Sequence, residues 1–531
     1  MGNNRESGTA RVTPIRASEW IRDDLVVRKG QLTLLNSTMT PLDAMTADTL
    51  FVRDALEVAG IAMHLVRGND DRPVIAVDLA ERPAVEAALV AATANEPFLA
   101  KPLASSSGAK RAQPIAEGAF AASPKARSFA VYRPRVEPLG RLRYGASTGV
   151  LLQFWSFGEH AVVSPAESAI TRRSIPVGEL HETTVERFGV LWQTYEGMFD
   201  PLASDIEFEI DLVFSWVDGT DLEFQRARAA QMQSYIVGEG DDHPARFRQL
   251  DELRYALRSV YLFAPWVRRI FIVTDSPRPV WLADDPRVTI VRSEEFFADV
   301  SVLPTHNSQA VESQLHRIPG IAEHFLYSND DMFFGRPVSP GMFFTPGGVS
   351  KFVEASTRIG LGEPTVDRSG FENAARVNRA LLRERFGVTI TRHLEHCAAP
   401  LRKSVLEELE REFPEDFTRT GASAFRARTD ISVTNSLYHY YALRTGRAVV
   451  QETASVKYVD TTTRAGLDDM HHLLKKRSVD MFCLNDGSFP EISTEERAHA
   501  VRSFLDRYFA IEAPWERSDN DLATTEEHDA V

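Results

Sequence analysis

Two adjacent carboxylates, Asp330 and Asp331, directly follow Asn329 in the sequence. The short apolar run before them, Phe325 to Tyr327, predicts a strand that ends at this polar turn. Carboxylate and amide oxygens are the hard ligands that Mg²⁺ or Mn²⁺ prefers. A cation held there could neutralise charge that builds on a leaving phosphate. A turn of solvated acids is the alternative, and the residue types alone leave both interpretations open.

A second polar turn, Asp218-Gly219-Thr220-Asp221, follows the apolar run Ile210 to Val217. The run predicts a buried strand, and open α/β sheets bind their ligands at the carboxyl ends of such strands. Gly219 allows a ligand to approach the backbone closely. An ordinary Asp-Gly turn without a ligand is the alternative.

The segment Arg392-His-Leu-Glu-His-Cys-Ala-Ala-Pro400 contains His396 just before a predicted helix. An imidazole is suited to take a proton from a sugar hydroxyl near neutral pH. His393, His306 and His316 are rival candidates, and spacing alone does not choose among them. A single histidine can equally be a structural residue.

Two more segments offer groups for phosphate or metal. Arg426 and Arg428 precede a predicted helix, and guanidiniums contact phosphate with two parallel hydrogen bonds. The sequence Leu484-Asn485-Asp486-Gly487 offers amide and carboxylate oxygens. The alternatives are a solvated basic turn and an ordinary Asn-Asp-Gly turn. No single one of these signals identifies an activity.

The elements that must position these groups begin near Ile206, where the pattern of the chain changes. Apolar runs predict strands at Ile210 to Val217, Ile270 to Val273, Val288 to Val291 and Phe325 to Tyr327. Helical spacing predicts helices over 246–263 and 310–318. Strands that alternate with helices predict an α/β fold with a mostly parallel, doubly wound sheet. Past Gly370 the pattern predicts a mostly helical part, including a helix that Asp430 caps and that runs to Arg444.

The first part of the chain predicts a smaller α+β accessory domain without chemical motifs. Leu42 to Thr93 predicts the order helix, strand, strand, helix, and Ala104 to Pro114 predicts a flexible loop. Gly149 to Phe157 is β-rich, with Trp155 and Phe157 expected to be buried. The expected boundaries are a disordered or extended segment 1–40, the accessory domain 41–204, the main domain 205–514 and an acidic, disordered tail 515–531.

Composition narrows the class of protein. Hydrophobic residues make up 43% of the 531 residues and charged residues 25%, which is typical of globular domains. A net charge of −15 argues against a nucleic-acid partner. Two cysteines, Cys397 and Cys483, are too few for a disulfide framework and fit a reducing compartment. With no signal peptide and no run of about 18 apolar residues, we expect a cytoplasmic protein without an integral membrane segment. Peripheral association with the inner face of the membrane and the oligomeric state are left open.

Taken together and in order, four blocks resemble the Stealth family of capsular and exopolysaccharide phosphotransferases, in its actinobacterial type. The family also contains the catalytic precursor of the eukaryotic lysosomal-enzyme N-acetylglucosamine-1-phosphotransferase. The matching blocks are Ile210 to Asp221; Arg248 to Thr274 with Pro286 to Ile290, Leu303 to Thr305, Glu312-Ser313, His316-Arg317 and Tyr327 to Gly335; His396 to Phe417 with Phe425-Arg426 and Asp430 to Tyr441; and Phe482 to Asp486. They span about residues 207–515.

The resemblance implies transfer of a hexose-1-phosphate from a UDP-sugar to a hydroxyl of an oligosaccharide or polysaccharide, with release of UMP. It implies that Asp218 and Thr220 line the nucleotide-sugar pocket, and that Asn329 contacts the donor diphosphate. It implies a metal site made by Asp330, Asp331, Asn485 and Asp486. The ion would be Mg²⁺ or Mn²⁺.

The resemblance also assigns the reacting groups. Glu312 matches a functional acid of the second block, His396 takes the place of the presumed base, and Arg426 would steady the phosphoryl group. Arg254 and Arg402 are further donor-binding candidates. His306 stands where relatives often carry an aromatic residue, so no catalytic role is given to it.

The implied mechanism has His396 take the acceptor proton while the sugar oxygen attacks the sugar-linked phosphorus in line. The sugar–oxygen bond survives, so the anomeric configuration is retained. The chief alternative is a metal-dependent UDP-sugar glycosyltransferase, which would release UDP. A non-catalytic carbohydrate-binding protein is the alternative from a different class.

Overall fold

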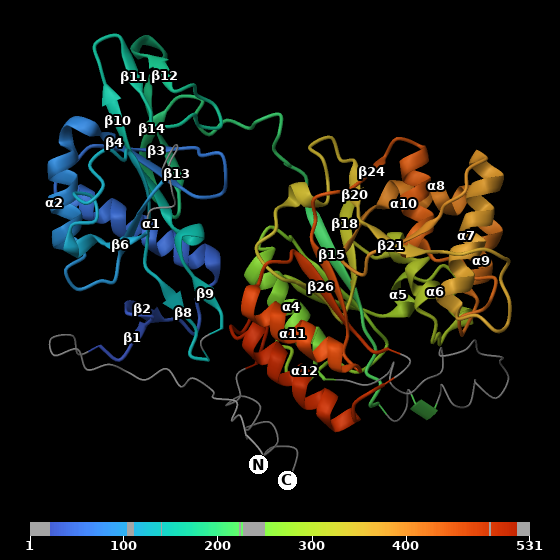
Figure 1. Cartoon of the computed structure of the whole chain (residues 1–531). Coiled ribbons are helices and arrows are strands. Elements are labelled where there is room, and N and C mark those ends of the chain that lie inside the picture. Colours follow the sequence, from blue (N-terminus) through green and yellow to red (C-terminus); the bar gives the residue numbers. More distant parts are fainter. Residues whose placement is uncertain are drawn as a thin grey trace, which may run out of the picture. The chain divides into compact units, whose positions relative to one another are not determined.

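The computed structural model describes residues 22–103, 111–139, 141–221, 225–226, 250–487 and 490–517 (Figure 1). The chain divides into two units, Met1–Leu202 and Ala203–Val531, and each is described by itself. The predictions for segments 1–21, 104–110, 246–249 and 518–531 lie outside the described residues. These include most of the extended N-terminus and most of the acidic tail.

The first unit consists of two helices and many short strands. Its elements are β1 (Leu25–Arg28), β2 (Gln31–Leu35), α1 (Pro41–Val58), β3 (Met63–Val66), β4 (Val74–Asp78), α2 (Arg82–Ala92), β5 (Leu99–Pro102), β6 (Gln113–Pro114), β7 (Ser128–Tyr132), β8 (Arg135–Val136), β9 (Arg143–Tyr144), β10 (Val150–Phe157), β11 (Ala161–Val163), β12 (Ser174–Pro176), β13 (Glu182–Arg187) and β14 (Val190–Tyr195). The predicted order of helix, strand, strand, helix is confirmed by α1, β3, β4 and α2.

The main sheet of this unit runs in the order β12-β11-β10-β7-β5-β6, and β3 joins it through β4 beside β10. Apolar residues of α1 and α2 share one core with alternate residues of β4, β7 and β10, so both helices cover the same face. Trp155 is buried as expected, but the prediction for Phe157 is wrong, since 42% of it is exposed. Phe157 ends β10 beyond the pairs with β4 and β7, where no layer covers the strand.

The second unit holds all the candidate site residues. Its elements are β15 (Ile210–Ser215), α4 (Glu252–Phe263), β16 (Ile270–Val273), β17 (Val288–Val291), α5 (Ser293–Phe296), α6 (Ser308–Glu312), β18 (His324–Asn329), β19 (Met332–Phe334), β20 (Ser350–Phe352), β21 (Glu354–Arg358), α7 (Gly370–Phe386), β22 (Arg392–Leu394), β23 (Ala399–Arg402), α8 (Lys403–Glu412), α9 (Pro414–Gly421), the π-helix η9 (Val433–Leu437), α10 (Tyr438–Arg444), β24 (Ala448–Val450), β25 (Val456–Asp460), α11 (Arg464–Lys476), β26 (Met481–Asn485) and α12 (Thr494–Tyr508).

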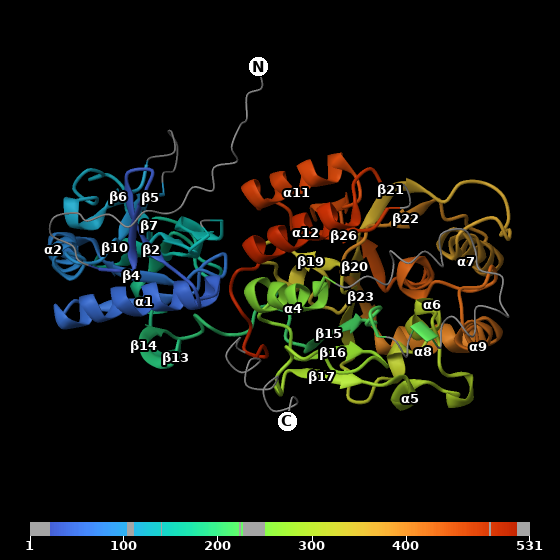
Figure 2. The same cartoon turned by 90° about the horizontal axis from the view of Figure 1, so that it is seen from below.

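The central sheet of the second unit runs in the order β17-β16-β15-β18-β23. The first four strands are parallel and β23 is antiparallel to β18. Figures 1 and 2 show α4, α11 and α12 on one side of the central strands and α6, α8 and α10 on the other. The prediction of an α/β fold with a mostly parallel, doubly wound sheet is confirmed.

Short strands interrupt the helical part past residue 370. Most important for the site is β26, which lies between β19 and β25 in a separate three-stranded sheet. The helix predicted over 310–318 is broken after α6, where the side chains of Ser313 and Gln314 bond to backbone groups of Ala310 and Ala298. Asp430 does not cap α10, because η9 precedes that helix and the Asp430 carboxylate accepts from Ala427, Ser423 and Asn307.

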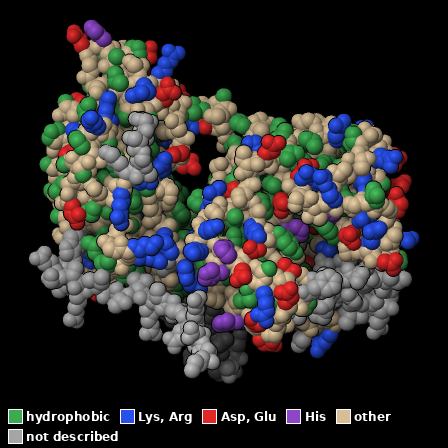
Figure 3. Space-filling model, in the orientation of Figure 1, with side chains coloured by type: hydrophobic (Ala, Val, Ile, Leu, Met, Phe, Trp, Pro, Cys, Tyr) green, Lys and Arg blue, Asp and Glu red, His purple; other side chains and the backbone are tan. Residues whose placement is uncertain are grey.

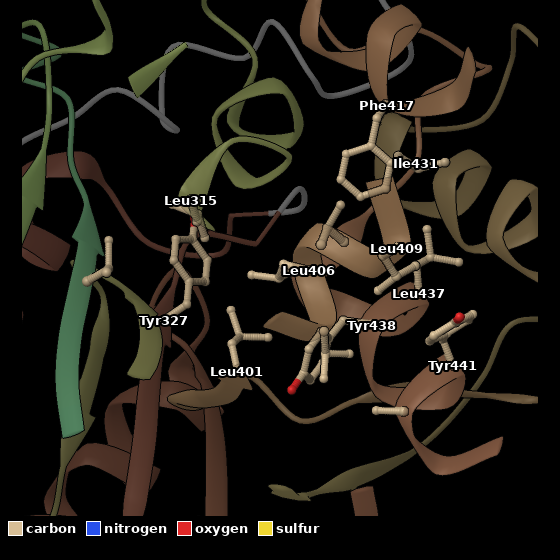
Figure 4. Close-up of a cluster of buried hydrophobic side chains, with 14 of the residues drawn as sticks. Leu315, Tyr327, Leu401, Leu406, Leu409, Phe417, Ile431, Leu437, Tyr438 and Tyr441 are labelled. Carbon is tan, nitrogen blue, oxygen red and sulfur yellow. The ribbon is translucent and has the colours of Figure 1, made fainter. Parts of the chain in front are cut away.

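A large apolar core fills the space between the central sheet and the helices on one side (Figure 4). Its labelled members are Leu315, Tyr327, Leu401, Leu406, Leu409, Phe417, Ile431, Leu437, Tyr438 and Tyr441. The amphipathic helix α8 contributes Val405, Leu406 and Leu409, which are fully buried as their helical spacing predicts. This core fixes β18 and β23 beside the segment that carries Arg426.

Acidic and basic side chains lie interspersed over the face of the molecule shown in Figure 3. The charge excess of −15 is therefore not gathered into one acidic area on that face. Among the helices of the described residues, none combines the length and the apolar character needed to cross a bilayer.

Candidate active site

The two polar turns predicted to bind a ligand leave the same edge of the central sheet. Ser215 at the end of β15 pairs in parallel register with Asn329 at the end of β18. Within the first turn, the Thr220 hydroxyl and backbone N–H donate to the Asp218 carboxylate at 2.7 and 2.9 Å. The Asp218 N–H donates to the Ser276 hydroxyl at 2.8 Å, which fixes the turn against the loop after β16.

Asp331 lies between β18 and β19 and faces the strand β26. Its carbonyl accepts from the backbone N–H of Leu484 at 2.9 Å, and the Cys483 thiol donates to its Oδ2 at 3.4 Å. The other carboxylate oxygen, Oδ1, is buried and has no hydrogen-bond partner among the described residues. Burial raises the pKa of Asp331, the positive charge of His396 lowers it and the charge of Asp486 raises it. The base candidate and two acids predicted at the metal site are therefore electrostatic neighbours.

Asn485 and Asp486 follow β26 and extend this cluster. The Asn485 amide donates to the hydroxyl of Tyr458, a residue of β25. Asp486 forms an ion pair with the buried Arg497 of α12 and accepts from the Thr461 hydroxyl at 3.1 Å. Asp486 is thus engaged by a protein cation.

His396 is half-buried in the loop between β22 and β23. Its ring lies 5.3 Å from the Tyr458 ring and 6.1 Å from the Phe371 ring, centroid to centroid. Among its rivals, His316 bonds to Glu410 of α8 at 2.9 Å, and His393 is buried in a stack on Phe371. His396 differs from these two in that its charge acts on Asp331 of the predicted metal site.

A second cluster surrounds Tyr327 on β18. The buried Glu312, at the end of α6, accepts from the Thr434 hydroxyl of η9 at 2.6 Å. Burial raises the pKa of Glu312, against the effects of the Thr434 bond and of the Arg426 charge. Burial and the charge of Glu312 raise the pKa of Tyr327, and Asp330 adds to the rise while Arg426 opposes it. Glu312, Asp330 and Arg426 thus gather around one buried phenol.

A cavity adjoins the Tyr327 cluster and the segment that carries His396. Its walls include Glu312, Asn329 and Thr434, together with Glu395 and Cys397, the two neighbours of His396. Groups from the second and third sequence blocks therefore face one space. A cavity lined by a buried acid, with a guanidinium and an imidazole in neighbouring segments, is an arrangement suited to group transfer.

Two predicted donor-binding residues lie apart from these clusters. Arg254 of α4 forms an ion pair with the buried Glu516, near the C-terminal end of the described residues. Arg402 pairs in register with His324, at the other end of β18 from Asn329, and bonds to Glu323 at 3.0 Å. The structure does not bring either guanidinium to the cavity.

Several residues of the site were not singled out from the sequence. Glu252 begins α4, is 7% exposed, and its pKa is raised by burial and by the charge of Asp331, while Arg497 lowers it. An acid in the first turn of an amphipathic helix ordinarily predicts a dipole interaction, not a buried site. Tyr458 belongs to no recognised motif, and only its contact with Asn485 connects it to the site. Thr434 lies within the third matching block, but its residue type gave no sign of the bond to Glu312.

The metal prediction has partial support from the donor chemistry. The buried Oδ1 of Asp331 has no hydrogen-bond partner among the described residues. A hard carboxylate oxygen in this state is suited to bind a divalent cation. Asp330 is adjacent in the chain and half-buried. Within the described ranges, however, no three histidine, cysteine, aspartate or glutamate side chains converge as a metal-binding group. The acids Asp330 and Asp331 fit a cation that phosphate oxygens also hold, rather than an all-protein cage.

The structure has an α/β fold with a cavity beside its polar turns, and comparison with known proteins identifies the chain as an enzyme of the transferase class. Models of the Stealth conserved regions 1 to 4 match residues 208–235, 246–352, 395–443 and 471–526. The protein named exopolysaccharide phosphotransferase CpsY of Mycobacterium leprae is 57% identical over 94% of this chain and 91% of its own. CpsY of Mycobacterium tuberculosis is 55% identical over 96% and 95%.

The chain therefore belongs to the Stealth family, and the resemblance drawn from its motifs is confirmed. A relative in Nocardia farcinica, also named exopolysaccharide phosphotransferase, is 53% identical over 90% of this chain and 88% of its own. Among solved structures, the galactosyltransferase LgtC overlays with a TM-score of 0.29 and 10% identity, over 57% of this chain and 96% of that one. We draw nothing from a likeness this weak.

Proposed function

We propose that the enzyme transfers a hexose-1-phosphate from a UDP-sugar to a glycan hydroxyl, releasing UMP and building a phosphodiester-linked exopolysaccharide. The observation that carries the proposal is that the charge of His396 acts on Asp331, and that a cavity lined by Glu312 and Asn329 also has both chain neighbours of His396 in its wall. A general base and buried acids around one space are what phosphoryl-type transfer requires. The names of the curated relatives support the same reaction.

In the proposed reaction, His396 takes the proton of the acceptor hydroxyl. The acceptor oxygen forms a bond to the sugar-linked phosphorus of the donor, and the bond from that phosphorus to the bridging oxygen of UMP breaks. The bond between the anomeric carbon and its oxygen is untouched, so the anomeric configuration is retained. Tyr458 and Phe371 hold the imidazole between them, which limits its rotation.

Arg426 is proposed to offset charge on the oxygens of the transferred group. Its guanidinium donates to the Ser308 hydroxyl at 2.8 Å and stabilises the charged form of Glu312. Glu312, which lines the cavity, is in turn tied to η9 through Thr434, and its charge attracts the Arg426 guanidinium. Arginine suits this role because its planar fork matches phosphate oxygens.

Asp330 and Asp331 are proposed to hold Mg²⁺ or Mn²⁺ together with oxygens of the donor, with Asn485 beside them. When bound, the cation would supply neutralisation of the charge on the departing UMP. Asp486, paired with Arg497, contributes to the electrostatic potential at the proposed metal site. Asp218 and Thr220, at the end of β15, are proposed to contact the nucleotide part of the donor.

The test is product analysis. The full-length enzyme is incubated with UDP-glucose, UDP-galactose and UDP-N-acetylglucosamine, an oligosaccharide acceptor and Mg²⁺ or Mn²⁺. We expect UMP by chromatography and a phosphodiester signal by phosphorus NMR. Release of UDP with a new glycosidic bond would instead establish the glycosyltransferase alternative. If acceptor-dependent nucleotide release fails with every pair tried, the transferase proposal is refuted for these substrates.

A further inference from the structure

The cavity of the candidate site has a largely apolar wall. Including its open mouth, its space measures about 590 Å³, and small-molecule pockets ordinarily measure about 300–1,000 Å³. Among the residues that line it are the apolar side chains of Met332, Met342, Phe343, Phe352, Leu394 and Met481. Phe343 and Phe352 are each 1% exposed, so the core holds their rings in place. A ligand of this cavity should therefore have apolar faces of its own.

Three polar side chains interrupt the apolar wall. They are Asn329 at the end of β18, Glu395 in the loop between β22 and β23, and Asn435 in η9, and all three are half-buried. Their amides and carboxylate form no hydrogen bond or ion pair with another described residue. Polar groups of this kind bond to water or to a ligand. Because an amide both donates and accepts and a carboxylate accepts, the ligand should offer groups that do both.

The charges of the wall do not favour a phosphate group. The wall contains the carboxyl groups of Glu312 and Glu395 and one cation, Lys351, whose Nζ donates to the Gly341 carbonyl at 2.7 Å. No arginine is among the described residues that line the cavity. Burial raises the pKa of both acids, and in either protonation state a carboxyl group can bond to a hydroxyl. The wall is thus better suited to a neutral ligand with hydroxyl groups than to an anion.

A hexose ring has the chemistry that this wall requires. Its two faces carry C–H groups, and its rim carries hydroxyls that each donate and accept hydrogen bonds. A purely apolar ligand would cover the free amides and the carboxylate without bonding to them, which is costly. A phosphate would accept hydrogen bonds only and would meet two acids. A sugar ring avoids both costs.

The position of the cavity favours the sugar of the donor. Asn329 directly precedes Asp330 and Asp331, which are proposed to hold the cation and the donor diphosphate. Glu395 directly precedes His396, whose charge acts on Asp331. In the proposed reaction the donor hexose is bonded through one oxygen to the phosphorus that lies between the cation and the base. A hexose in this cavity would therefore be close to both groups.

We infer that the cavity binds the hexose of the UDP-sugar, and that Asn435 and Glu395 bond to its ring hydroxyls and determine which hexose is accepted. The inference rests on the proposed function and adds to it the place of the sugar ring. Asn435 belongs to a π-helical turn whose Thr434 is fixed by its bond to Glu312 at 2.6 Å. Such turns often occur at functional sites.

A binding test follows the NMR signals of isotope-labelled methionine methyl groups in the full-length protein, without donor or metal. Met332, Met342 and Met481 line the cavity, whereas Met45 is buried in α1 of the first unit. The probes are the methyl α-glycosides of glucose, galactose and N-acetylglucosamine, each up to about 100 mM because a lone sugar ring binds weakly. We expect the three cavity signals to shift with at least one glycoside, and Met45 to stay. Inorganic phosphate should leave Met342 and Met481 unshifted.

The kinetic test uses deoxy analogues of the accepted UDP-hexose and of the acceptor, each without one hydroxyl. For wild type, removal of the donor hydroxyl that Asn435 contacts should lower kcat/KM about 10- to 100-fold, because the amide then lacks its partner. In Asn435→Ala the same removal should lower kcat/KM about twofold or less, since the contact is already lost. The acceptor analogues should not show this dependence on Asn435.

A second variant and a control guard against an effect on folding. Asn435→Asp keeps the size of the side chain but loses its N–H donors, and it should also weaken the discrimination between hydroxyls. The melting temperatures of both variants are compared with that of wild type. Asn95→Ala makes the same change as Asn435→Ala at an exposed position of the first unit, and it should discriminate as wild type does.

The results separate this inference from the proposed function. Shifts of the cavity methionines with phosphate but with no glycoside would overturn the inference, as would an Asn435-dependent effect confined to the acceptor analogues. Equal hydroxyl effects in wild type and Asn435→Ala would remove Asn435 as a selecting residue. Glycoside binding without any turnover would support the pocket and count against the transfer reaction. Release of UMP without an Asn435-dependent hydroxyl effect would support the transfer and refute the inference.

Discussion

Replacement of His439 by glutamine should change how the stability of the protein depends on pH. His439 is fully buried in α10, where its Nε2 bonds to the Thr434 carbonyl at 3.0 Å and its Nδ1 has no partner. Burial lowers its pKa to about 3. The fold therefore holds a neutral imidazole, whereas the unfolded chain binds a proton near the ordinary histidine pKa of about 6.5.

The sign and size of the effect follow from linkage. Below pH 6.5 His439 binds a proton in the unfolded state but stays neutral in the folded state. The free energy of unfolding therefore falls as the pH decreases toward the folded pKa of about 3. Between pH 7.5 and pH 5 the loss attributable to His439 is about 2 kcal/mol, since each pKa unit corresponds to about 1.4 kcal/mol. Asp430 acts in the opposite direction, because burial raises its pKa to about 6. Its contribution is common to both proteins and cancels in the comparison.

The assay is urea unfolding of wild type and His439→Gln at pH 7.5 and pH 5. Glutamine keeps a donor for the Thr434 carbonyl but cannot be protonated. We expect the wild type to lose about 2 kcal/mol more than the variant between the two pH values. Hydrogen exchange of the peptide covering η9 and α10 assigns the transition to the second unit. His499→Gln, at an exposed position of α12, serves as the control.

An equal loss in wild type and His439→Gln would refute this reasoning. It would mean that the His439 imidazole is charged or hydrated in the folded state, so that water reaches the interior beside η9. The result also bears on activity, because η9 carries the Thr434 hydroxyl that bonds to Glu312 at 2.6 Å. A π-helical turn at a cavity wall is often a functional feature, and here it places Thr434.

Three further outcomes are expected. His396→Asn should lower kcat by about 10²- to 10⁴-fold with little change in donor affinity. The control His471→Ala, at an exposed position, should keep the wild-type rate. If His396→Asn turned over at close to the wild-type rate, His396 would not be the base. Arg497→Met should lower the free energy of unfolding by about 3–5 kcal/mol, measured by urea, because it leaves the Asp486 carboxylate buried without its cation. Tyr458→Phe keeps the ring beside the imidazole but removes a hydroxyl that fixes an active-site amide, so kcat/KM should fall about fivefold at an unchanged melting temperature. A fall in melting temperature that matches the loss of activity would give this tyrosine a structural role instead.

Strands with strong apolar runs could be predicted from the sequence. The predicted bounds Ile270 to Val273 and Val288 to Val291 are those of β16 and β17. The runs are short, β-branched and bounded by polar residues, so local pattern and tertiary structure agree there. By contrast, β25 and β26 were not predicted, because they form strands through pairing with each other and with β19, and no local pattern indicates those partners.

Site residues that depend on distant partners could not be predicted in the same way. Glu252 is buried through α12, which carries Arg497, far along the chain. Arg254 had the residue type of a phosphate ligand, but its partner is Glu516, and no local pattern indicates that pairing. The proximity of His396 to Asp331 likewise arises from the pairing of β23, which follows His396, with β18, which precedes Asp331, and not from spacing in the sequence.

The segments that the family models match and those that they do not match contribute different residues to the candidate site. The proposed base His396 and the proposed metal ligand Asp331 lie in regions that the family models match. The aromatic neighbours of His396, Phe371 and Tyr458, lie in segments 353–394 and 444–470, which those models do not cover. Chemistry common to a family requires fixed reacting groups, whereas recognition of one glycan requires contacts that differ between members. We therefore expect the unmatched segments around His396 to determine the choice of acceptor.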